Sequence, residues 1–329
     1  MKIATSREAL QAFRSLRPAS VWAQGEIDPS GMFRQVGPGD GGHRVYAGFP
    51  SPVVQPKFTI SPDAGIFTAG SCFAREIEKV LHARGLNLLS WANGAGLEDV
   101  LLHRYTTHAI AAEFQFALEG TYDPANIVPF RDRWFDYTGH GEAPSREALL
   151  DQRLKVINLF KQSAKADVIV LTLGLVETWF DTQTKSYTNI APWSNFLGGR
   201  FELHVTDYAE NRRVLEQLIG LLRTRIRRDI KIVLTVSPVP LSQTFGGQDI
   251  IVANTYSKSV LRAVAQDLAQ GDPFIDYFPS YEMVTLADPT TTWFPDHRHV
   301  LPEFVAQIMD AFLIAYMPDV AGTTESPPP

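Results

Sequence analysis

The chain has 329 residues, of which 45% are apolar and 20% are charged, and its formal net charge is −6 at pH 7. This composition is typical of an ordinary soluble globular protein with ample material for a hydrophobic core. The acidic balance and the lack of a basic stripe argue against a nucleic-acid partner. The single cysteine, Cys72, excludes an intramolecular disulfide and favours a reducing compartment.

The two ends of the chain differ in composition from its middle. Residues 1–57 are rich in glycine and proline, with one short helix candidate at Arg7–Leu16, and are expected to form an extension packed on the domain. Residues 58–318 are expected to form one catalytic domain, and residues 319–329 a disordered tail. No apolar run approaches the roughly 20 residues that span a bilayer, and no signal-peptide core is present, so a cytoplasmic location is expected. The sequence leaves the oligomeric state open.

Between these ends, predicted strands and helices alternate. The strand candidates are Gly65–Ala69, Asn87–Ser90, Ala166–Leu173, Ile230–Val236 and Phe274–Tyr277. The helix candidates are Phe73–Arg84, Leu101–Leu118, Arg146–Ala164, Tyr208–Arg228, Thr255–Ala269 and Pro302–Tyr316. Two strands, 168–171 and 232–234, are apolar on both faces, which is typical of parallel strands buried between helical layers. The pattern predicts a three-layer α/β/α sandwich with a mainly parallel five-stranded sheet, and ligands bind beyond the carboxyl ends of such strands.

The most informative motif is Gly70-Ser71-Cys72-Phe73-Ala74, at the junction between the first core strand and the first core helix. A serine there presents its hydroxyl at the carboxyl end of a strand, beside the free N–H groups that open a helix. Those are the requirements for a serine nucleophile with adjacent oxyanion donors. The competing interpretation is that Ser71 simply caps the helix.

The same motif resembles the signature of the GSCFA-domain family, relatives of the SGNH/GDSL hydrolases. Three further segments support the resemblance and occur in the family's order: 171–179, 234–240 and 276–282. The resemblance covers about residues 60 to 315. It implies a flavodoxin-like, SGNH-type sheet and an acyl-transfer chemistry that uses a serine.

A serine nucleophile needs a base and a group that orients the base. Asp296 and His299 stand three residues apart just before the last helix, which is the D-x-x-H spacing of SGNH hydrolases. By that resemblance Asp296 orients the imidazole, His299 is the base and Ser71 attacks. His297 is the alternative base, and the proline that commonly follows the histidine is replaced by Val300. The competing interpretation is that Asp296 caps the final helix and the histidines lie on the surface.

Oxyanion donors are expected from several loops. The N–H of Ser71 is the first, and Gly174, after the strand 168–173, matches a turn where SGNH enzymes place another. The asparagine usual in that region is absent, and Glu177 stands near its position. An ionised carboxylate cannot donate a hydrogen bond, so Glu177 is expected to bind substrate or to have another role. The remaining donors are expected from other loops, at Gly94 or Gly96, Asn93 or Asn254.

Two other features of the sequence bear on the site. Cys72 is a second candidate nucleophile at the helix N-terminus, although free cysteines are commonly small buried hydrophobes. The segment Ser237-Pro238-Val239-Pro240 predicts a rigid rim after a buried strand, and Trp179, Tyr187 and Trp193 could stack on sugar rings or pack into a lid. No metal site, phosphate loop or dinucleotide fingerprint is predicted, so no cofactor is expected.

These features favour a serine-dependent acyl hydrolase or acyltransferase acting on an O-acyl group, in the first place acetyl, of a carbohydrate or other small molecule. The alternative is a catalytically inactive carbohydrate-binding or assembly protein with the same fold, which Glu177 and Val300 favour. A thiol enzyme that uses Cys72 is a third hypothesis.

Overall fold

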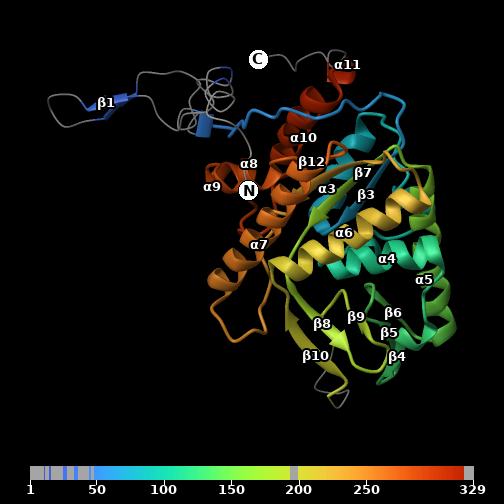
Figure 1. Ribbon diagram of the computed structural model, residues 1–329. Coiled ribbons are helices and arrows are strands. Elements are labelled where there is room, and N and C mark those ends of the chain that lie inside the picture. Colours follow the sequence, from blue (N-terminus) through green and yellow to red (C-terminus); the bar gives the residue numbers. More distant parts are fainter. Residues whose placement is uncertain are drawn as a thin grey trace.

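The computed structural model describes residues 48–192 and 199–321, together with residues 11, 15, 25–27, 33–35 and 44–45 (Figure 1). The helices are α3 (Cys72–Ala83), α4 (Thr107–Glu119), α5 (Arg146–Phe160), α6 (Tyr208–Arg225), α7 (Ile250–Gly271), α8 (Ser280–Thr285), α9 (Pro289–Thr292), α10 (Pro302–Tyr316) and α11 (Pro318–Ala321). The strands are β1 (Gly25–Ile27), β2 (Phe33–Gln35), β3 (Ile66–Gly70), β4 (Ile127–Phe130), β5 (Arg133–Asp136), β6 (Gly141–Ala143), β7 (Val168–Leu173), β8 (Glu177–Asp181), β9 (Ser186–Tyr187), β10 (Phe201–Val205), β11 (Lys231–Val236) and β12 (Ile275–Tyr277).

The central sheet has the strand order β12-β11-β7-β3, and every pairing in it is parallel. This confirms the predicted α/β class with a mainly parallel sheet. The predicted fifth strand, Asn87–Ser90, is wrong: Leu88 forms only an isolated bridge with Ile66. Two residues further on, the Ser90 hydroxyl, at 3.0 Å, accepts the Thr68 N–H where a strand would use a backbone carbonyl. The ladder therefore ends in a side-chain contact.

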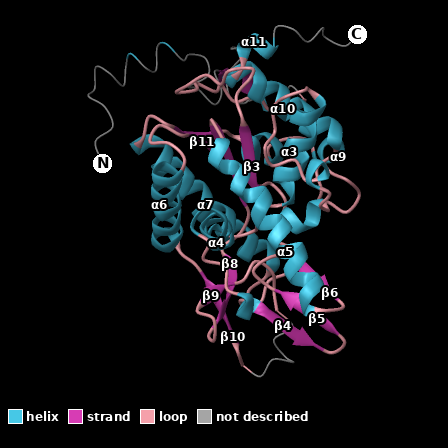
Figure 2. Ribbon diagram, turned by 90° about the vertical axis from the view of Figure 1, so that its right-hand side faces the viewer, coloured by secondary structure: helices cyan, strands magenta, loops and turns pink. Residues whose placement is uncertain are grey.

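Helices cover both faces of this sheet (Figure 2). Alternate strand residues face a core formed with α4, α5, α6 and α7, among them Phe67, Ile169 and Leu234. The residues between them, including Ile66 and Val170, face a second core formed with α3, α8 and α10. Side chains of a strand alternate between its faces, so a strand that is apolar throughout can serve two cores. The three-layer sandwich follows from that pattern.

Two small antiparallel sheets, β4-β5-β6 and β10-β8-β9, lie together at the lower end of Figure 1, and the sequence did not predict them. Their strands are two to five residues long. In the β4–β5 hairpin, a non-glycine residue, Arg131, takes the left-handed conformation at φ 55°. Without a glycine or asparagine at that turn, the usual hairpin signal is missing.

The described part of the N-terminal region packs on α10. The backbone N–H of Ile60 donates to the Tyr316 carbonyl at 2.7 Å, and the Phe49 ring lies 5.2 Å from that of Phe304. The helix candidate Arg7–Leu16 falls outside the described residues apart from residues 11 and 15. At the other end, α11 occupies the first residues of the expected tail, and residues 322–329 lie outside the described part. Among the described helices, none is both long and apolar enough to cross a membrane.

Candidate functional site around Ser71

Ser71 follows the last residue of β3 and precedes the first residue of α3, as the sequence predicts. The sharp turn between them depends on Gly70, whose φ is +144°. A Cβ atom at Gly70 would lie 2.2 Å from the carbonyl oxygen of Thr172 on the neighbouring strand. Only glycine fits so close to β7, and this close approach sets Ser71 at the carboxyl edge of the sheet.

The hydroxyl of Ser71 is buried and has no hydrogen-bond partner among the described residues. Ser71 occupies the N-cap position of α3, yet its side chain makes no capping hydrogen bond. The capping interpretation therefore fails on geometry, because a capping serine accepts an N–H of the first turn. Other buried hydroxyls share this condition, among them Thr172 and Ser237. The hydroxyl of Ser71 differs from that of Thr172 in its position at a strand-to-helix turn, where it is available to a ligand.

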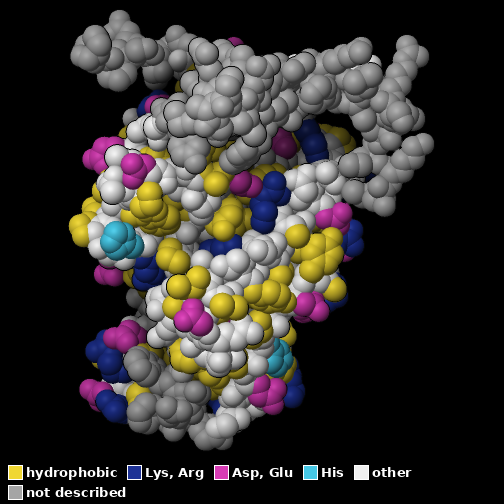
Figure 3. All heavy atoms as spheres, turned by 90° about the vertical axis from the view of Figure 1, so that its left-hand side faces the viewer, with side chains coloured by type: hydrophobic (Ala, Val, Ile, Leu, Met, Phe, Trp, Pro, Cys, Tyr) yellow, Lys and Arg dark blue, Asp and Glu magenta, His cyan; other side chains and the backbone are white. Residues whose placement is uncertain are grey.

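Ser71 opens onto a cavity of about 670 Å³. Most of the wall comes from segments that follow strand ends and from β8. The lining residues are Ser71, Cys72, Tyr105, His140, Gly174, Leu175, Glu177, Thr178, Trp179, Thr188, Asn189, Ile190, Ala191, Pro192, Ser237, Val239, Pro240, Leu241, Ser242, Gln243, Phe245 and Arg298. The predicted rim, 237–240, is thus part of the wall, and so is Trp179, whereas Tyr187 is not and Trp193 falls outside the described residues. The segment between β11 and α7 belongs to the face shown in Figure 3, where hydrophobic side chains form several patches.

The structure forms one part of the expected triad. The Nδ1 atom of His299 lies 2.6 Å from Oδ2 of Asp296, and the other carboxylate oxygen accepts the His299 N–H at 3.0 Å. The hydrogen bond to His299 is the main reason that the pKa of Asp296 lies well below its usual value. This contact fixes the orientation of the imidazole and leaves Nε2 as the ring nitrogen that does not face Asp296.

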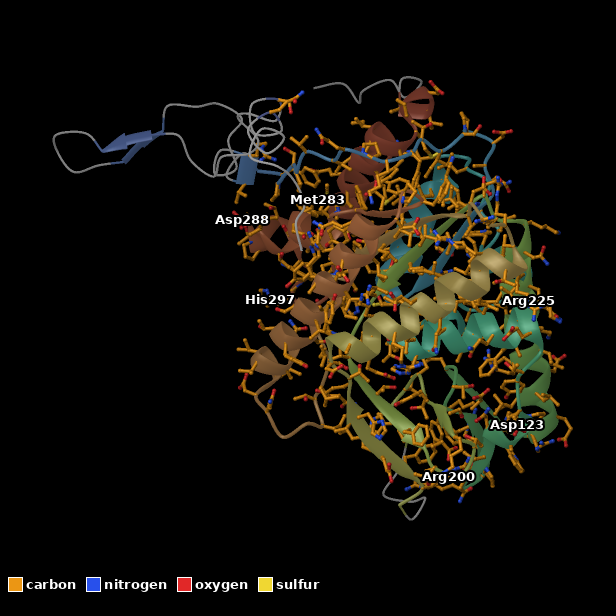
Figure 4. All side chains as sticks on the ribbon, viewed as in Figure 1. Asp123, Arg200, Arg225, Met283, Asp288 and His297 are labelled. Atoms are coloured by element: carbon orange, nitrogen blue, oxygen red, sulfur yellow. The ribbon has the colours of Figure 1, made fainter. Side chains whose placement is uncertain are left out.

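The expected hydrogen bond between Ser71 and this histidine is not formed. His299 and Asp296 are 49% and 47% exposed, and neither lines the cavity. The residue between the two candidate histidines, Arg298, lines it instead. The backbone N–H groups of Arg298 and His299 both donate to Asp296, and this folds the loop into a tight turn in which Arg298, not His299, lines the cavity. His297, with a left-handed φ of 51°, lies on the same side of the molecule as Met283 and Asp288, opposite Arg225 (Figure 4).

Most of the expected oxyanion donors are engaged or lie elsewhere. The N–H of Ser71 donates to the Thr172 carbonyl at 3.2 Å, as in a continuation of the parallel ladder, so it is not free. Asn93 and Gly94 are exposed in a short 3₁₀ turn and do not line the cavity, nor does Gly96, which ends that turn. Asn254 accepts the Leu241 N–H at 3.2 Å and supports the wall from behind.

Gly174 is the expected donor position that the fold brings to Ser71. A Cβ atom at Gly174 would lie 3.4 Å from the Ser71 Cβ and 2.5 Å from the carbonyl oxygen of Tyr105. The absence of a side chain therefore lets three segments meet beside the hydroxyl. Gly174 is held there by Lys258, whose ammonium donates to its carbonyl at 2.7 Å.

Glu177 also lines the cavity, but its carboxylate is already used. One oxygen accepts the hydroxyl of Thr244, and the other accepts the Phe245 N–H at 3.0 Å. Glu177 therefore holds the segment between β11 and α7 against β8. This contact explains why a carboxylate stands where a donor was expected: it faces donors of this chain.

Burial changes the pKa values of two side chains near Ser71, those of Cys72 and Lys258. Burial raises the pKa of the Cys72 thiol, and the positive charge of Arg298 offsets only part of that rise. A thiol with a raised pKa is a poorer nucleophile at neutral pH, which favours Ser71 over Cys72. Lys258, 2% exposed on α7, donates to the carbonyls of Gly174 and Val239, and burial lowers its pKa to about 7.

Several cavity residues were not predicted from the sequence. The rings of Tyr105 and His140 meet edge to face with their centroids 5.3 Å apart. Burial lowers the pKa of His140 to about 4, so its imidazole is neutral at pH 7. The amide oxygen of Asn189 accepts the Tyr105 N–H at 2.8 Å, and its NH₂ group donates to the His103 carbonyl at 2.8 Å. No sequence motif marks these residues, because they reach the site from segments far apart in the chain.

Within the described ranges, no cluster of three or more metal-binding side chains is found.

The fold and the site define the class of this protein: it is an α/β protein in which a serine at a strand-to-helix turn opens onto a cavity. The family model of GSCFA matches residues 65–312, and the chain belongs to the GSCFA family. No curated protein sequence matches the chain. Among solved structures, a family 3 carbohydrate esterase from Clostridium thermocellum is similar at 12% identity and a TM-score of 0.32, over 80% of this chain and 98% of that chain. That likeness is too distant to bear on activity.

Proposed function

We propose that this protein is a serine-dependent acyl hydrolase or acyltransferase that acts on O-acetyl groups of a carbohydrate. The observation that carries the proposal is the Ser71 hydroxyl, which is buried, unpartnered and open to a cavity large enough for a small substrate. The position depends on Gly70 with its positive φ and its close approach to Thr172, yet the Ser71 hydroxyl makes no hydrogen bond among the described residues. Nucleophilic catalysis is a use that such a hydroxyl fits.

In the proposed reaction, the Ser71 oxygen attacks the acyl carbon, and its proton passes to Nε2 of His299. The ester bond to the leaving oxygen then breaks as the imidazolium returns the proton to that oxygen. Water or a second hydroxyl attacks the acyl-enzyme by the same route in reverse. The contact of Nδ1 with Asp296 favours the tautomer that this reaction needs, with a proton on Nδ1 and Nε2 able to accept another.

The reaction requires the loop 293–300 to turn His299 toward Ser71 when substrate binds. Hydrogen bonds between Phe294 and His299 and between Phe294 and His297, both 2.9 Å, hold the loop as a compact turn. Catalytic contacts are often long or unformed without substrate, so a movement of this kind is compatible with the geometry.

The second candidate function is a carbohydrate-binding or assembly protein without catalysis. The exposed position of His299, away from the cavity, favours it. The two candidates differ in one measurement, which is labelling of folded protein by a fluorophosphonate. A serine enzyme is labelled at Ser71 and hydrolyses p-nitrophenyl acetate, and both signals disappear in Ser71→Ala. Folded wild-type protein that is not labelled at Ser71 supports the binding protein instead.

A further inference from the structure

Arg298 is a cavity residue without a carboxylate partner among the described residues. Its Nε donates to the Pro240 carbonyl at a long 3.4 Å, and it takes part in none of the ion pairs between described residues. The nearby Asp296 is occupied: one oxygen accepts the backbone N–H groups of Arg298 and His299, and the other faces the His299 ring. Most N–H groups of the guanidinium therefore have no acceptor among the described residues.

Arg298 lines the site, and its charge acts on neighbours of Ser71. Burial raises the pKa of Tyr105 to about 12, and the charge of Arg298 is among the influences that oppose this rise. The same charge acts on Cys72, which adjoins the serine. Arg298 therefore lies within electrostatic reach of the serine's surroundings, on a wall that is mostly apolar.

A second cation stands behind the same wall without a carboxylate. Lys258 is bonded to two carbonyls, and after burial, which lowers its pKa most, the charge of Arg298 lowers it further. Lys258 is therefore only partly charged at neutral pH, so the positive charge at this wall comes mainly from Arg298. Among the described residues, Glu177 is the carboxylate that lines the cavity, and it is already bonded to Thr244 and Phe245.

We propose that the cavity beside Ser71 binds a carboxylate through the guanidinium of Arg298, so that the ester substrate of this site carries an acidic group. A guanidinium presents paired donors that match the two oxygens of a carboxylate, and the apolar wall strengthens the interaction by excluding water. The inference rests on the proposed function for the ester, but the binding of the anion does not require catalysis. The carboxylate belongs either to an acidic saccharide or to the acyl chain.

The test is equilibrium binding to Ser71→Ala, which removes turnover, by isothermal titration calorimetry. D-glucuronate is compared with D-glucuronamide, and glutarate with glutaramide, so that each pair differs in charge and hardly in shape. We expect at least one carboxylate to bind about tenfold to a hundredfold more tightly than its amide, because hydrogen bonds to charged groups contribute more than neutral ones. Tighter binding of glucuronate assigns the carboxylate to the saccharide, and tighter binding of glutarate assigns it to the acyl chain.

The same measurement is made after Arg298→Gln in the Ser71→Ala background. We expect the preference for the carboxylate to fall to within twofold of the amide, and Arg298→Lys to retain part of it. Arg228→Gln, which removes an equal charge from an exposed position, is the matched control and is expected to change neither ligand's affinity. Circular dichroism checks that each variant is folded.

Two results overturn the proposal: neither carboxylate binds more tightly than its amide, or Arg298→Gln leaves the preference intact. The proposed function fails on a different result, namely full esterase activity in Ser71→Ala. Carboxylate binding that depends on Arg298 would survive that failure, so the two outcomes are separable.

Discussion

The protein contains two groups of buried or half-buried cations, and it treats them in opposite ways. Between α4 and α5, Arg104 and Arg153 are both paired with Glu113 at 2.6 Å, and Arg153 also reaches Asp136 at 3.1 Å. At the cavity, Lys258 is bonded to carbonyls and Arg298 has no carboxylate among the described residues. The first group is neutralised within the fold.

The difference indicates what each region is for. Taking a charge out of water is costly unless an opposite charge and hydrogen bonds replace the solvent. In the interior cluster each of the four side chains, those of Arg104, Arg153, Glu113 and Asp136, has an opposite charge beside it. The cavity does not, and it also holds a buried hydroxyl without a partner. Uncompensated polar groups gathered at one strand edge are typical of a site that a ligand completes.

The largest effect on activity is expected from Asp296→Asn. This variant tests whether the exposed pair of Asp296 and His299 takes part in catalysis in the cavity. Asparagine keeps an acceptor for the loop but favours the wrong imidazole tautomer, so kcat/KM for p-nitrophenyl acetate should fall by up to about 10⁴-fold. The melting temperature should hardly change, since the pair is exposed. His297→Ala is the control and should cost far less than His299→Ala. Equal losses in the two histidine variants would contradict the assignment of the base.

The interior cluster is tested by Glu113→Gln. Removing the carboxylate leaves Arg104 and Arg153 buried with too little negative charge, which should lower the free energy of unfolding by about 3–5 kcal/mol. Urea denaturation followed by circular dichroism measures it. Glu142→Gln is the matched control, because its pair with Arg133 is about half exposed and should contribute less than about 1 kcal/mol. A small effect at Glu113 would remove the contrast between the two regions.

Lys258 is tested by the pH dependence of stability. Its pKa is about 7 in the folded protein against 10.5 for an ordinary lysine. Between these values the unfolded chain holds a proton that the folded chain lacks, so the free energy of unfolding rises with pH, by at most about 1.4 kcal/mol per unit. Below pH 7 both states are protonated and this dependence disappears.

The measurement is the difference between wild type and Lys258→Met across pH 7 to 10, which cancels the titration of other groups. Wild type should gain stability relative to the variant as the pH rises. Parallel curves would show that Lys258 keeps an ordinary pKa in the fold, and the second cation behind the cavity would then be fully charged.

The smallest effect is expected from Glu177→Gln. The amide keeps one acceptor for the segment at Thr244 and Phe245 but loses the charge, so one hydrogen bond weakens by about 0.5–1.5 kcal/mol. The KM for p-nitrophenyl acetate should rise twofold to tenfold, while kcat stays within twofold. Faster limited proteolysis of residues 242–247 is the second readout. Glu202→Gln, at an exposed position of β10, is the control. A hundredfold loss of kcat in Glu177→Gln would give the carboxylate a chemical role instead.

Local sequence determined the order of the elements and the position of the serine. β7 and β11 are apolar on both faces, and that pattern can only be satisfied between two helical layers. The turn at Gly70-Ser71 was equally readable, because a glycine between a strand and an amphipathic helix marks a tight junction. The pairing of Asp296 with His299 needed only three residues of spacing, and it formed.

Tertiary structure decided what faces the serine. Tyr105, His140 and Lys258 come from three separate segments, and no local pattern marks residues that meet only after the chain has folded. Which side chain of the loop 293–300 enters the cavity depends on the direction of the backbone at that point. That direction is set by a bridge between Trp293 and Val300 and by the packing of the neighbouring helices. A spacing of residues specifies a pair, but the orientation of the loop that carries it is a property of the whole fold.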